Sequence, residues 1–238
     1  MLIGEDAMKR LKSSRVIVFG VGGVGGYVVE ALARAGIGTI DVVDNDSVSI
    51  TNLNRQIIAL HSTVGRAKVQ VIAERIHDIN PECTVNDHEV FFLPETEDLF
   101  DFSTYDYVID AIDTVKGKIQ LVVKAEETNT PIIACMGTGN KLNPAMLEVS
   151  DINKTSVDPL ARVMRRELKA RGIKKLKVVY SKEEPIKPEY PKEMYIDGKP
   201  PRFPGSTSFV PPVAGMIIAS EVVKDLTINK VNDNRNGR

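Results

Sequence analysis

The chain has 238 residues, of which 42% are hydrophobic and 26% charged, an ordinary balance for a soluble protein that can bury a full core as one large domain. Its formal net charge of −1 gives no overall attraction to nucleic acid or to a membrane, so any such surface must be local. The two cysteines, Cys83 and Cys135, form no CxxC pair, which argues against a disulfide framework or a zinc site and favours a cytoplasmic location.

Strands and helices alternate along the first part of the chain. Strands are predicted at 16–19, 39–43, 83–91, 105–113 and 131–136, and helices at 2–12, directly after Gly25, at 65–80 and at 116–129. Such repeats predict an α/β fold: a Rossmann-like, doubly wound and mostly parallel sheet covered on both faces. Ligands of such sheets bind at the carboxyl ends of the strands, so we expect a nucleotide site there.

The second part of the chain is less regular, although a further strand is predicted at 176–180. Eight of the thirteen prolines lie between 183 and 212, which predicts a long irregular loop. An apolar helix is expected at about 212–226, but the surrounding prolines and polar residues argue against a membrane span. We expect one domain over 1–226, a nucleotide-binding half at about 15–140, a substrate-binding half at about 141–226, and a polar tail over 227–238.

A glycine-rich turn, Gly20-Val-Gly-Gly-Val-Gly25, follows the first strand. Gly20 permits the turn, Gly22 lets a phosphate approach the backbone beside Gly23, and Gly25 lets the helix pack closely on the strand. The N–H groups and the positive end of the helix dipole would then face an anion. Asp44 ends the second strand, where a carboxylate can accept hydrogen bonds from a ribose. The stretch predicts a nucleotide site.

The residues after Asp44 indicate which nucleotide to expect. A glycine turn alone is typical of NAD or FAD folds, but here Asn52-Leu-Asn-Arg-Gln56 follows the second strand and Lys68 opens the next helix. Each cation alone would be interpreted as a solvated surface side chain. Together, an amide, a guanidinium and an ammonium suit the triphosphate of ATP, whereas the pyrophosphate of a dinucleotide can rely on backbone N–H groups.

Asp113 follows the strand predicted at 105–113 and has two interpretations. An acid at a strand-to-helix turn commonly caps the next helix. Beside an ATP site, the same carboxylate suits Mg²⁺, which prefers oxygen ligands and usually takes one or two carboxylates from protein. With the other ATP motifs in place, we favour the magnesium role.

The first half resembles the ubiquitin-activating-like adenylating fold, which includes the sulfur-carrier adenylyltransferases of the HesA, MoeB and ThiF type. The resemblance rests on Gly20-x-Gly-Gly-x-Gly25, Asp44-x-Asp46, Asn52-Leu-Asn-Arg-Gln56, Gly65-x-x-Lys68 and Asp110-x-x-Asp113. It implies that ATP is bound at the ribose by Asp44 and at the phosphates by Asn52, Arg55 and Lys68, with Asp46 and Gln56 in the same site and Asp113 on Mg²⁺. It also implies that Arg55, Lys68 and Asp113 are the catalytic residues. Thr114 departs from the pattern, because the family usually has Asn there.

A basic run lies in the second half. Residues 162–182 hold nine Lys or Arg against one acid, Glu167. This could be a solvated helix face, a surface for an acidic partner protein, or the footprint of a nucleic-acid backbone. We favour the last, carried by Arg162, Arg165, Arg166, Lys169, Lys174 and Lys175.

Nearly the whole chain, about 2–226, closely resembles the tRNA threonylcarbamoyladenosine dehydratases. The likeness rests on Gly137-Thr-Gly-Asn-Lys-Leu142, Lys154-Thr-Ser-Val-Asp-Pro-Leu160, Arg165-Arg-Glu-Leu168 and Val178-Val-Tyr-Ser-Lys-Glu-Glu-Pro185. It implies that ATP adenylates the carboxylate of the threonylcarbamoyl group on a tRNA adenosine, and that the urea group then closes a ring and expels AMP. It also implies a homodimer, to which relatives usually contribute an arginine upstream of the Leu2-Ile-Gly4 that opens this chain.

Two other functions are weighed against this one. An adenylyltransferase for the C-terminus of a sulfur-carrier protein would use the basic face on an acidic partner, and a sulfur-relay protein is a partner to test in either case. An NAD-dependent oxidoreductase or a non-catalytic nucleotide module is disfavoured by Arg55 and Lys68. Neither cysteine has the flanking cations that favour a thiolate, so we expect no thioester step.

Overall fold

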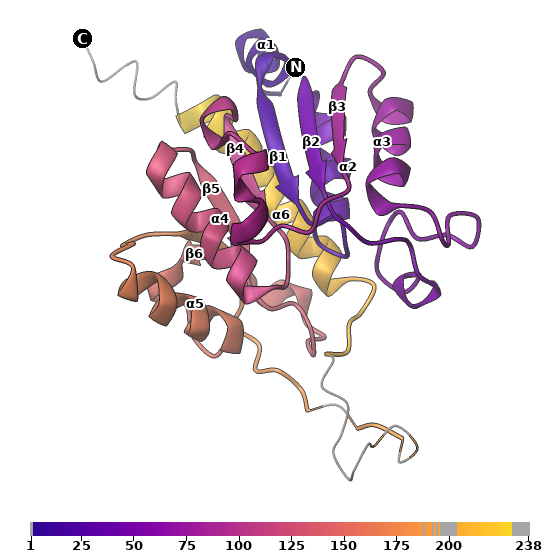
Figure 1. The fold of residues 1–238 in the computed structure, drawn as a ribbon, viewed down its shortest axis with the longest axis vertical. Coiled ribbons are helices and arrows are strands. Elements are labelled where there is room, and N and C mark those ends of the chain that lie inside the picture. Colours follow the sequence, from indigo (N-terminus) through magenta and orange to yellow (C-terminus); the bar gives the residue numbers. More distant parts are fainter. Residues whose placement is uncertain (1, 188, 192, 194, 196–203, 230–238) are drawn as a thin grey trace.

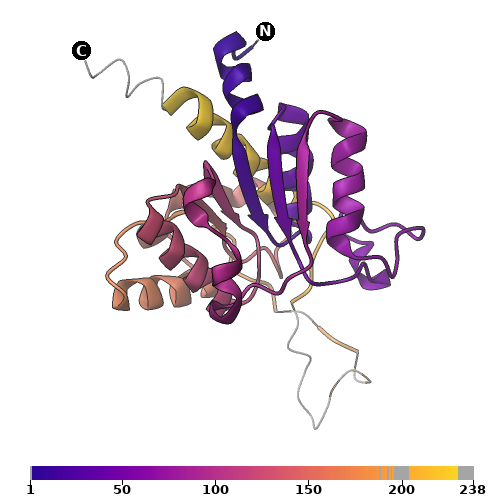
Figure 2. The same ribbon diagram turned by 45° about the horizontal axis from the view of Figure 1, so that its top comes forward.

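The computed structural model describes residues 2–187, 189–191, 193, 195 and 204–229, and its centre is one seven-stranded sheet with the order β3-β2-β1-β4-β5-β7-β6 (Figures 1 and 2). The strands are β1 (Arg15–Phe19), β2 (Thr39–Val43), β3 (Thr84–His88), β4 (Tyr107–Asp110), β5 (Ile132–Cys135), β6 (Leu147–Asp151) and β7 (Lys177–Ser181). Every neighbouring pair is parallel except β6 and β7. The predicted Rossmann-like α/β fold with a mostly parallel sheet is confirmed.

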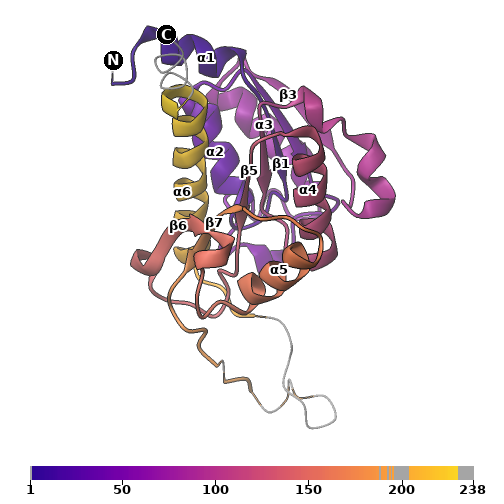
Figure 3. The same ribbon diagram turned by 90° about the vertical axis from the view of Figure 1, so that its left-hand side faces the viewer.

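Helices cover both faces of the sheet (Figure 3). They are α1 (Glu5–Ser13), α2 (Gly25–Ala35), α3 (Lys68–Ile79), α4 (Val115–Thr128), α5 (Pro159–Ala170) and α6 (Val210–Lys224). The apolar residues of α2, α3 and α6 form one core with one face of the sheet, while α4 and α5 contribute to the cores on the other face. This double cover explains why the central strands are apolar on both sides.

Strand β1 shows how the sequence builds these layers. Val16 and Val18 belong to the core under α2 and α6, while Ile17 and Phe19 belong to the core under α4. The ring of Phe19 lies 4.7 Å from that of Phe92, centroid to centroid, within an aromatic cluster. Since alternate side chains point to opposite faces, a continuous apolar run is what a strand buried on both sides needs.

The sheet contains one strand that the sequence analysis did not predict. Strand β6, Leu147–Asp151, pairs antiparallel with β7 at the edge of the sheet. Only Leu147 is buried in it, so its side chains give a weak strand pattern. Its place depends on the partner strand rather than on its own residues.

The ends of the last helix also differ from the prediction. Helix α6 begins at Val210 rather than near Pro212, with Pro211 and Pro212 in its first turn, where a missing N–H breaks no helical hydrogen bond. Beyond α6, a π-helical turn continues over Asp225–Asn229, into the start of the predicted polar tail, and Thr227 is buried. Residues 230–238 lie outside the described residues.

The proline-rich loop predicted at 183–212 is described only in part, since 188, 192, 194 and 196–203 lie outside the described residues. Its described parts up to Phe209 contain no strand. Within the described ranges, no helix has both the length and the apolar character needed to cross a bilayer.

The strand order reverses direction at β1, which lies between β2 and β4. At the carboxyl end of β1, the N–H of Gly20 donates to the carbonyl of Val43 (2.8 Å), and the N–H of Ala111 donates to that of Phe19 (2.8 Å). The segments that follow β1, β2 and β4 therefore meet at one point. In open α/β sheets, this switch point is where ligands bind.

Candidate active site

The glycine turn between β1 and α2 has the tight geometry that its sequence predicts. Gly20 has φ +87°, in the left-handed region that disfavours other residues, and a Cβ there would lie 2.8 Å from the carbonyl oxygen of Ala111. A Cβ on Gly25 would lie 1.7 Å from the carbonyl oxygen of Gly20. These two glycines allow β1, α2 and the segment after β4 to come together at the switch point.

Asp44 lies at the end of β2, beside the glycine turn. One carboxylate oxygen accepts the N–H of Val21 (2.9 Å), and the other accepts the N–H of Asp46 (2.9 Å). The side chain is 10% exposed. The carboxylate is thus fixed against the turn, at the strand end where the sequence places a ribose contact.

Lys68 is the first residue of α3, and its side chain is 6% exposed. The Nζ atom lies 2.7 Å from a carboxylate oxygen of Asp46 and 3.6 Å from one of Asp44. The sequence predicts that this ammonium binds phosphate, whereas its contact with two carboxylates is apparent only in the structure. The contact holds a positive charge at the edge of the glycine turn, because a buried ammonium is stable only when paired.

Arg55 is held by the short segment after β2. Asn52 is buried, and its amide oxygen accepts the N–H of Ser49 (3.0 Å), which closes a 3₁₀ turn. The Nη1 atom of Arg55 donates to the carbonyl of Thr51 (3.0 Å) and to the amide oxygen of Asn54 (2.9 Å). The guanidinium is therefore oriented by its own segment before any contact with a ligand.

This segment packs directly on the glycine turn. The stem of Arg55 and the ring of Pro211 would each lie 3.3 Å from a Cβ on Gly23, and the amide nitrogen of Gln56 would lie 3.6 Å from a Cβ on Gly22. The amide oxygen of Gln56 is buried without a hydrogen-bond partner, one of two such side-chain atoms among the described residues. An unpaired buried acceptor beside a glycine turn marks a place where a ligand donor would be favourable.

Asp113 lies in the turn between β4 and α4 and is exposed. The residue at the N-cap of α4 is Thr114, which makes no capping bond with its side chain, so the capping interpretation of Asp113 is not realised. The hydroxyl of Thr114 lies 3.5 Å from the Asp113 carboxylate. The described residues contain no group of three or more potential metal-binding side chains. One or two carboxylates are what Mg²⁺ usually takes from a protein, so Asp113 fits that role and the role stays a prediction.

The turn that carries Asp113 is fixed by a buried ion pair that the sequence analysis missed. Lys118 and Asp110 are both fully buried, with Nζ 2.9 Å from the carboxylate, and Nζ also donates to the carbonyls of Ile112 (3.1 Å) and Cys135 (2.8 Å). Burial raises the pKa of Asp110, and Lys118 opposes that shift. A lysine within the apolar stripe of a helix was the signal that could have revealed the pair.

A second buried pair anchors the basic helix α5. The Nζ atom of Lys141 lies 2.7 Å from the Asp158 carboxylate and 2.7 Å from the carbonyl of Gly137. The other oxygen of Asp158 accepts the N–H of Ala161 (2.8 Å) and so caps α5. The start of α5 is therefore tied to the carboxyl end of β5, on the same edge of the sheet as the glycine turn.

The basic residues do not all reach this edge. Five of them are exposed: Arg162, Arg166, Lys169, Lys174 and Lys175. Arg165 is half-buried and donates to the carbonyl and the hydroxyl of Thr155, so it braces α5. Lys174 and Lys175 precede β7, near the amino ends of the strands, because Lys177 is in register with Ile133. The structure thus separates these two lysines from the glycine turn, while α5 begins close to it.

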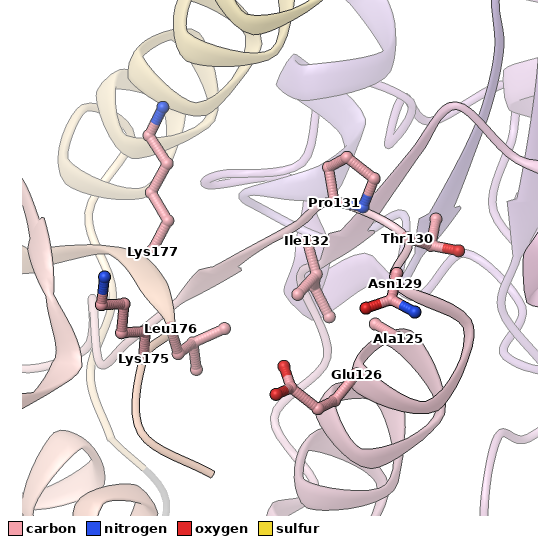
Figure 4. Close-up of a pocket in the computed structure, with 9 residues that line it drawn as sticks. All are labelled: Ala125, Glu126, Asn129, Thr130, Pro131, Ile132, Lys175, Leu176 and Lys177. Carbon is pink, nitrogen blue, oxygen red and sulfur yellow. The ribbon is translucent and has the colours of Figure 1, made fainter.

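A pocket of about 320 Å³ lies at this opposite edge, between the end of α4 and the start of β7 (Figure 4). Its walls include Glu126, Asn129, Ile132, Lys175 and Leu176. None of the predicted nucleotide-binding residues lines it, so this pocket is not the predicted nucleotide site.

Both cysteines are buried free thiols. Burial raises the pKa of Cys83 to about 11 and that of Cys135 to about 12. Neither is therefore a thiolate near neutral pH, as expected for a site without a thioester step.

The glycine turn, two carboxylates and two cations at the switch point of a doubly wound sheet are features of nucleotide-binding α/β proteins. A model described as the ThiF family matches residues 1–237, so the chain belongs to the ThiF family. A curated tRNA threonylcarbamoyladenosine dehydratase of Bacillus subtilis is 45% identical over 245 residues, covering 98% of this chain and 96% of that protein.

Solved structures agree with the sequence comparison. The crystal structure of the Escherichia coli tRNA N6-threonylcarbamoyladenosine dehydratase in complex with ATP matches with a TM-score of 0.87 and 36% identity, covering 97% of this chain and 93% of that chain. Among the sequence relatives, the probable adenylyltransferase/sulfurtransferase MoeZ of Mycobacterium tuberculosis is 44% identical over 112 residues, which is 47% of this chain and 28% of that protein.

Proposed function

We propose that this chain is an ATP-dependent dehydratase that acts on threonylcarbamoyladenosine in tRNA. The observation that carries the proposal is the nearly full-length likeness to dehydratases of that name, including one in complex with ATP. The likeness to a sulfur-carrier adenylyltransferase spans less than half of the chain. For that reason we favour the tRNA substrate over a carrier protein.

The reaction has two steps. The substrate carboxylate attacks the α-phosphorus of ATP, an O–P bond forms, and pyrophosphate leaves. The substrate's own urea group then attacks the activated carbonyl carbon and loses a proton to solvent, the bond to the phosphate oxygen breaks, and AMP leaves the cyclic product. The ring closure needs no enzyme thiol, in keeping with the raised pKa values of both cysteines. The protein neutralises charge and positions the reacting groups.

In this proposal the predicted nucleotide-binding residues contact different parts of ATP. Asp44 binds the ribose, and Asn52, Arg55 and Lys68 contact the phosphates, with Gln56 in the same site. The packing of the Arg55 stem beside Gly23 supports this assignment, and the unpaired amide oxygen of Gln56 could accept from a hydrogen-bond donor of the nucleotide. Asp46 holds the Lys68 ammonium at the site's edge.

Mg²⁺ is a further part of the proposal, with Asp113 as the residue that would hold it. Its exposure, and the absence of any capping role, leave the carboxylate free for that purpose. The ion would supply positive charge to the phosphates.

The tRNA contact is assigned to helix α5. Its exposed cations, Arg162, Arg166 and Lys169, would contact the tRNA backbone near the site.

We also propose a homodimer in the cytoplasm. Helix α6 is apolar nearly all round, and Phe209 and Met216 are 43% and 44% exposed, which supports a second subunit packed against it. Light scattering tests the homodimer: Met216→Glu should shift the dimer towards monomer, and a monomeric wild type would contradict the proposal.

A sulfur-relay protein is a further proposed partner. The support for it is the family resemblance alone, and a binding measurement with the purified partner tests it.

The function is tested by ATP–pyrophosphate exchange with three additions: tRNA carrying threonylcarbamoyladenosine, a sulfur-carrier protein, and buffer. We expect exchange with the modified tRNA only, and loss of water from the modified nucleoside by mass spectrometry. Exchange that requires the carrier protein instead would overturn the proposal. Binding of NAD with no affinity for ATP would overturn the nucleotide assignment as well.

A further inference from the structure

Two residues just before α6, Gly205 and Ser206, bridge two segments that are far apart in the chain. On one side, Asn140 donates its N–H to the carbonyl of Gly205 (2.7 Å), and its amide oxygen accepts the N–H of Gly205 (2.7 Å). On the other side, the carbonyl of Ser206 accepts the side-chain amide of Asn54 (2.9 Å). Three hydrogen bonds thus connect the segment after β5 to the segment after β2.

The side chain of Asn54 uses both of its polar atoms in this bridge. Its nitrogen donates to Ser206, and its oxygen accepts the Nη1 of Arg55 at 2.9 Å. Neither bond survives if the amide rotates by half a turn, so each bond fixes the orientation that the other requires. The guanidinium of Arg55 is therefore oriented partly by a residue more than a hundred positions away in the chain.

The opposite end of the bridge leads to the basic helix. Asn140 is followed directly by Lys141, whose ammonium is bonded to Asp158, and Asp158 caps α5. A Cβ on Gly139 would lie 2.6 Å from Pro204, so the bridge also packs closely against this segment. A continuous set of contacts thus runs from the start of α5 to Arg55.

We propose that Asn54 is a positioning residue for Arg55, and that the Gly205–Ser206 bridge couples ligand binding at the basic helix to ATP binding. The inference rests on the proposed function, since Arg55 matters only where a phosphate is bound. A tRNA that orders the segment around Asn140 strengthens the bridge, and the bridge holds Arg55 ready for the phosphates. Such coupling is reciprocal, so ATP tightens tRNA binding by the same factor.

The test measures the affinity for a non-hydrolysable ATP analogue with and without the modified tRNA. In the wild type we expect tRNA to tighten analogue binding about fivefold or more. Asn54→Ala should abolish that factor and lower kcat about tenfold, with tRNA affinity in the absence of nucleotide unchanged. Asn80→Ala is the matched control, because Asn80 also donates its amide to a distant backbone carbonyl, that of Ile37, away from the site.

A second variant separates coupling from folding. Asn140 has φ +58°, which glycine tolerates, so Asn140→Gly removes only the side-chain acceptor of Gly205. It should lose the coupling factor while its affinity for the analogue alone stays that of the wild type. If Asn54→Ala and Asn140→Gly both kept the wild-type coupling factor and the wild-type kcat, the role of the bridge would be overturned, while the proposed function would stand. A wild type that releases no AMP with modified tRNA overturns the proposed function instead.

Discussion

The ammonium of Lys68 lies close to the carboxylates of Asp44 and Asp46 and offsets the negative charge that the fold has placed at the edge of the glycine turn. In the proposed function it also offers positive charge to a triphosphate. Without it, the phosphates would face two carboxylates. Sequence spacing predicts the phosphate role, whereas the contact with the carboxylates depends on side chains brought together by folding.

We expect Lys68→Ala to lower ATP-dependent adenylation about 100-fold or more, because a phosphate contact is lost and two carboxylates are left to repel the phosphates. Pyrophosphate exchange measures the effect. Lys9→Ala is the control, since Lys9 is exposed and its ammonium lies 3.9 Å from Asp6. Unchanged affinity of Lys68→Ala for ATP in calorimetry would remove Lys68 from the site.

For Asp113→Ala we expect an activity loss of about 100-fold with no change in thermal stability, because the side chain is exposed and caps no helix. Asp98→Ala, also an exposed acid, should behave as the wild type in both measurements. A clear fall in the melting temperature of Asp113→Ala would favour a structural role. If Asp113→Ala catalysed ATP–pyrophosphate exchange at the wild-type rate in limiting Mg²⁺, the metal-binding role of Asp113 would be ruled out.

The thiols give a pH-dependent prediction. Because burial raises the folded-state pKa of Cys83 to about 11 and that of Cys135 to about 12, the thiolate fraction at pH 8 is smaller in the folded than in the unfolded protein. Alkylation by iodoacetamide at pH 8 should therefore be slow until the protein is unfolded. Adenylation between pH 6 and 9 should not follow a thiol titration. Rapid alkylation with loss of activity would contradict both statements.

At the scale of elements, helix α5 combines two kinds of basic residue that look alike in the sequence. Arg162, Arg166 and Lys169 are exposed, while Arg165 bonds to Thr155 and braces the helix. The apolar residues Ala161, Met164 and Leu168 lie on the opposite side of α5, which is buried. Helical spacing predicts the basic face but not which guanidinium is used internally.

We expect replacement of Arg162, Arg166 and Lys169 together by alanine to weaken tRNA binding and to reduce the salt dependence of the affinity by about two to three counterions. Arg165→Ala should leave that slope unchanged and lower stability by about 1 kcal/mol. Fluorescence anisotropy across a salt series, with thermal unfolding of each variant, distinguishes them. An unchanged slope in the triple variant would move the tRNA surface away from α5.

At the scale of the whole molecule, the sequence predicts the features that are local in the chain. The glycine turn, Asp44 at a strand end and the alternation of strands and helices each depend on neighbouring residues, and the structure has them. The pairs Lys118–Asp110 and Lys141–Asp158, and the bridge from Asn54 to Ser206, depend on contacts between separate segments. No periodicity encodes such contacts, so they emerge only with the fold.

The order of the last two strands has a consequence for synthesis on the ribosome. Strand β6 comes before β7 in the chain, yet its place at the sheet edge depends on pairing with β7. The first five strands can assemble as they emerge, while β6 must wait for some thirty further residues before its template exists. Translation that stalls between these strands would expose the bare edge of β5 as a docking site for other chains.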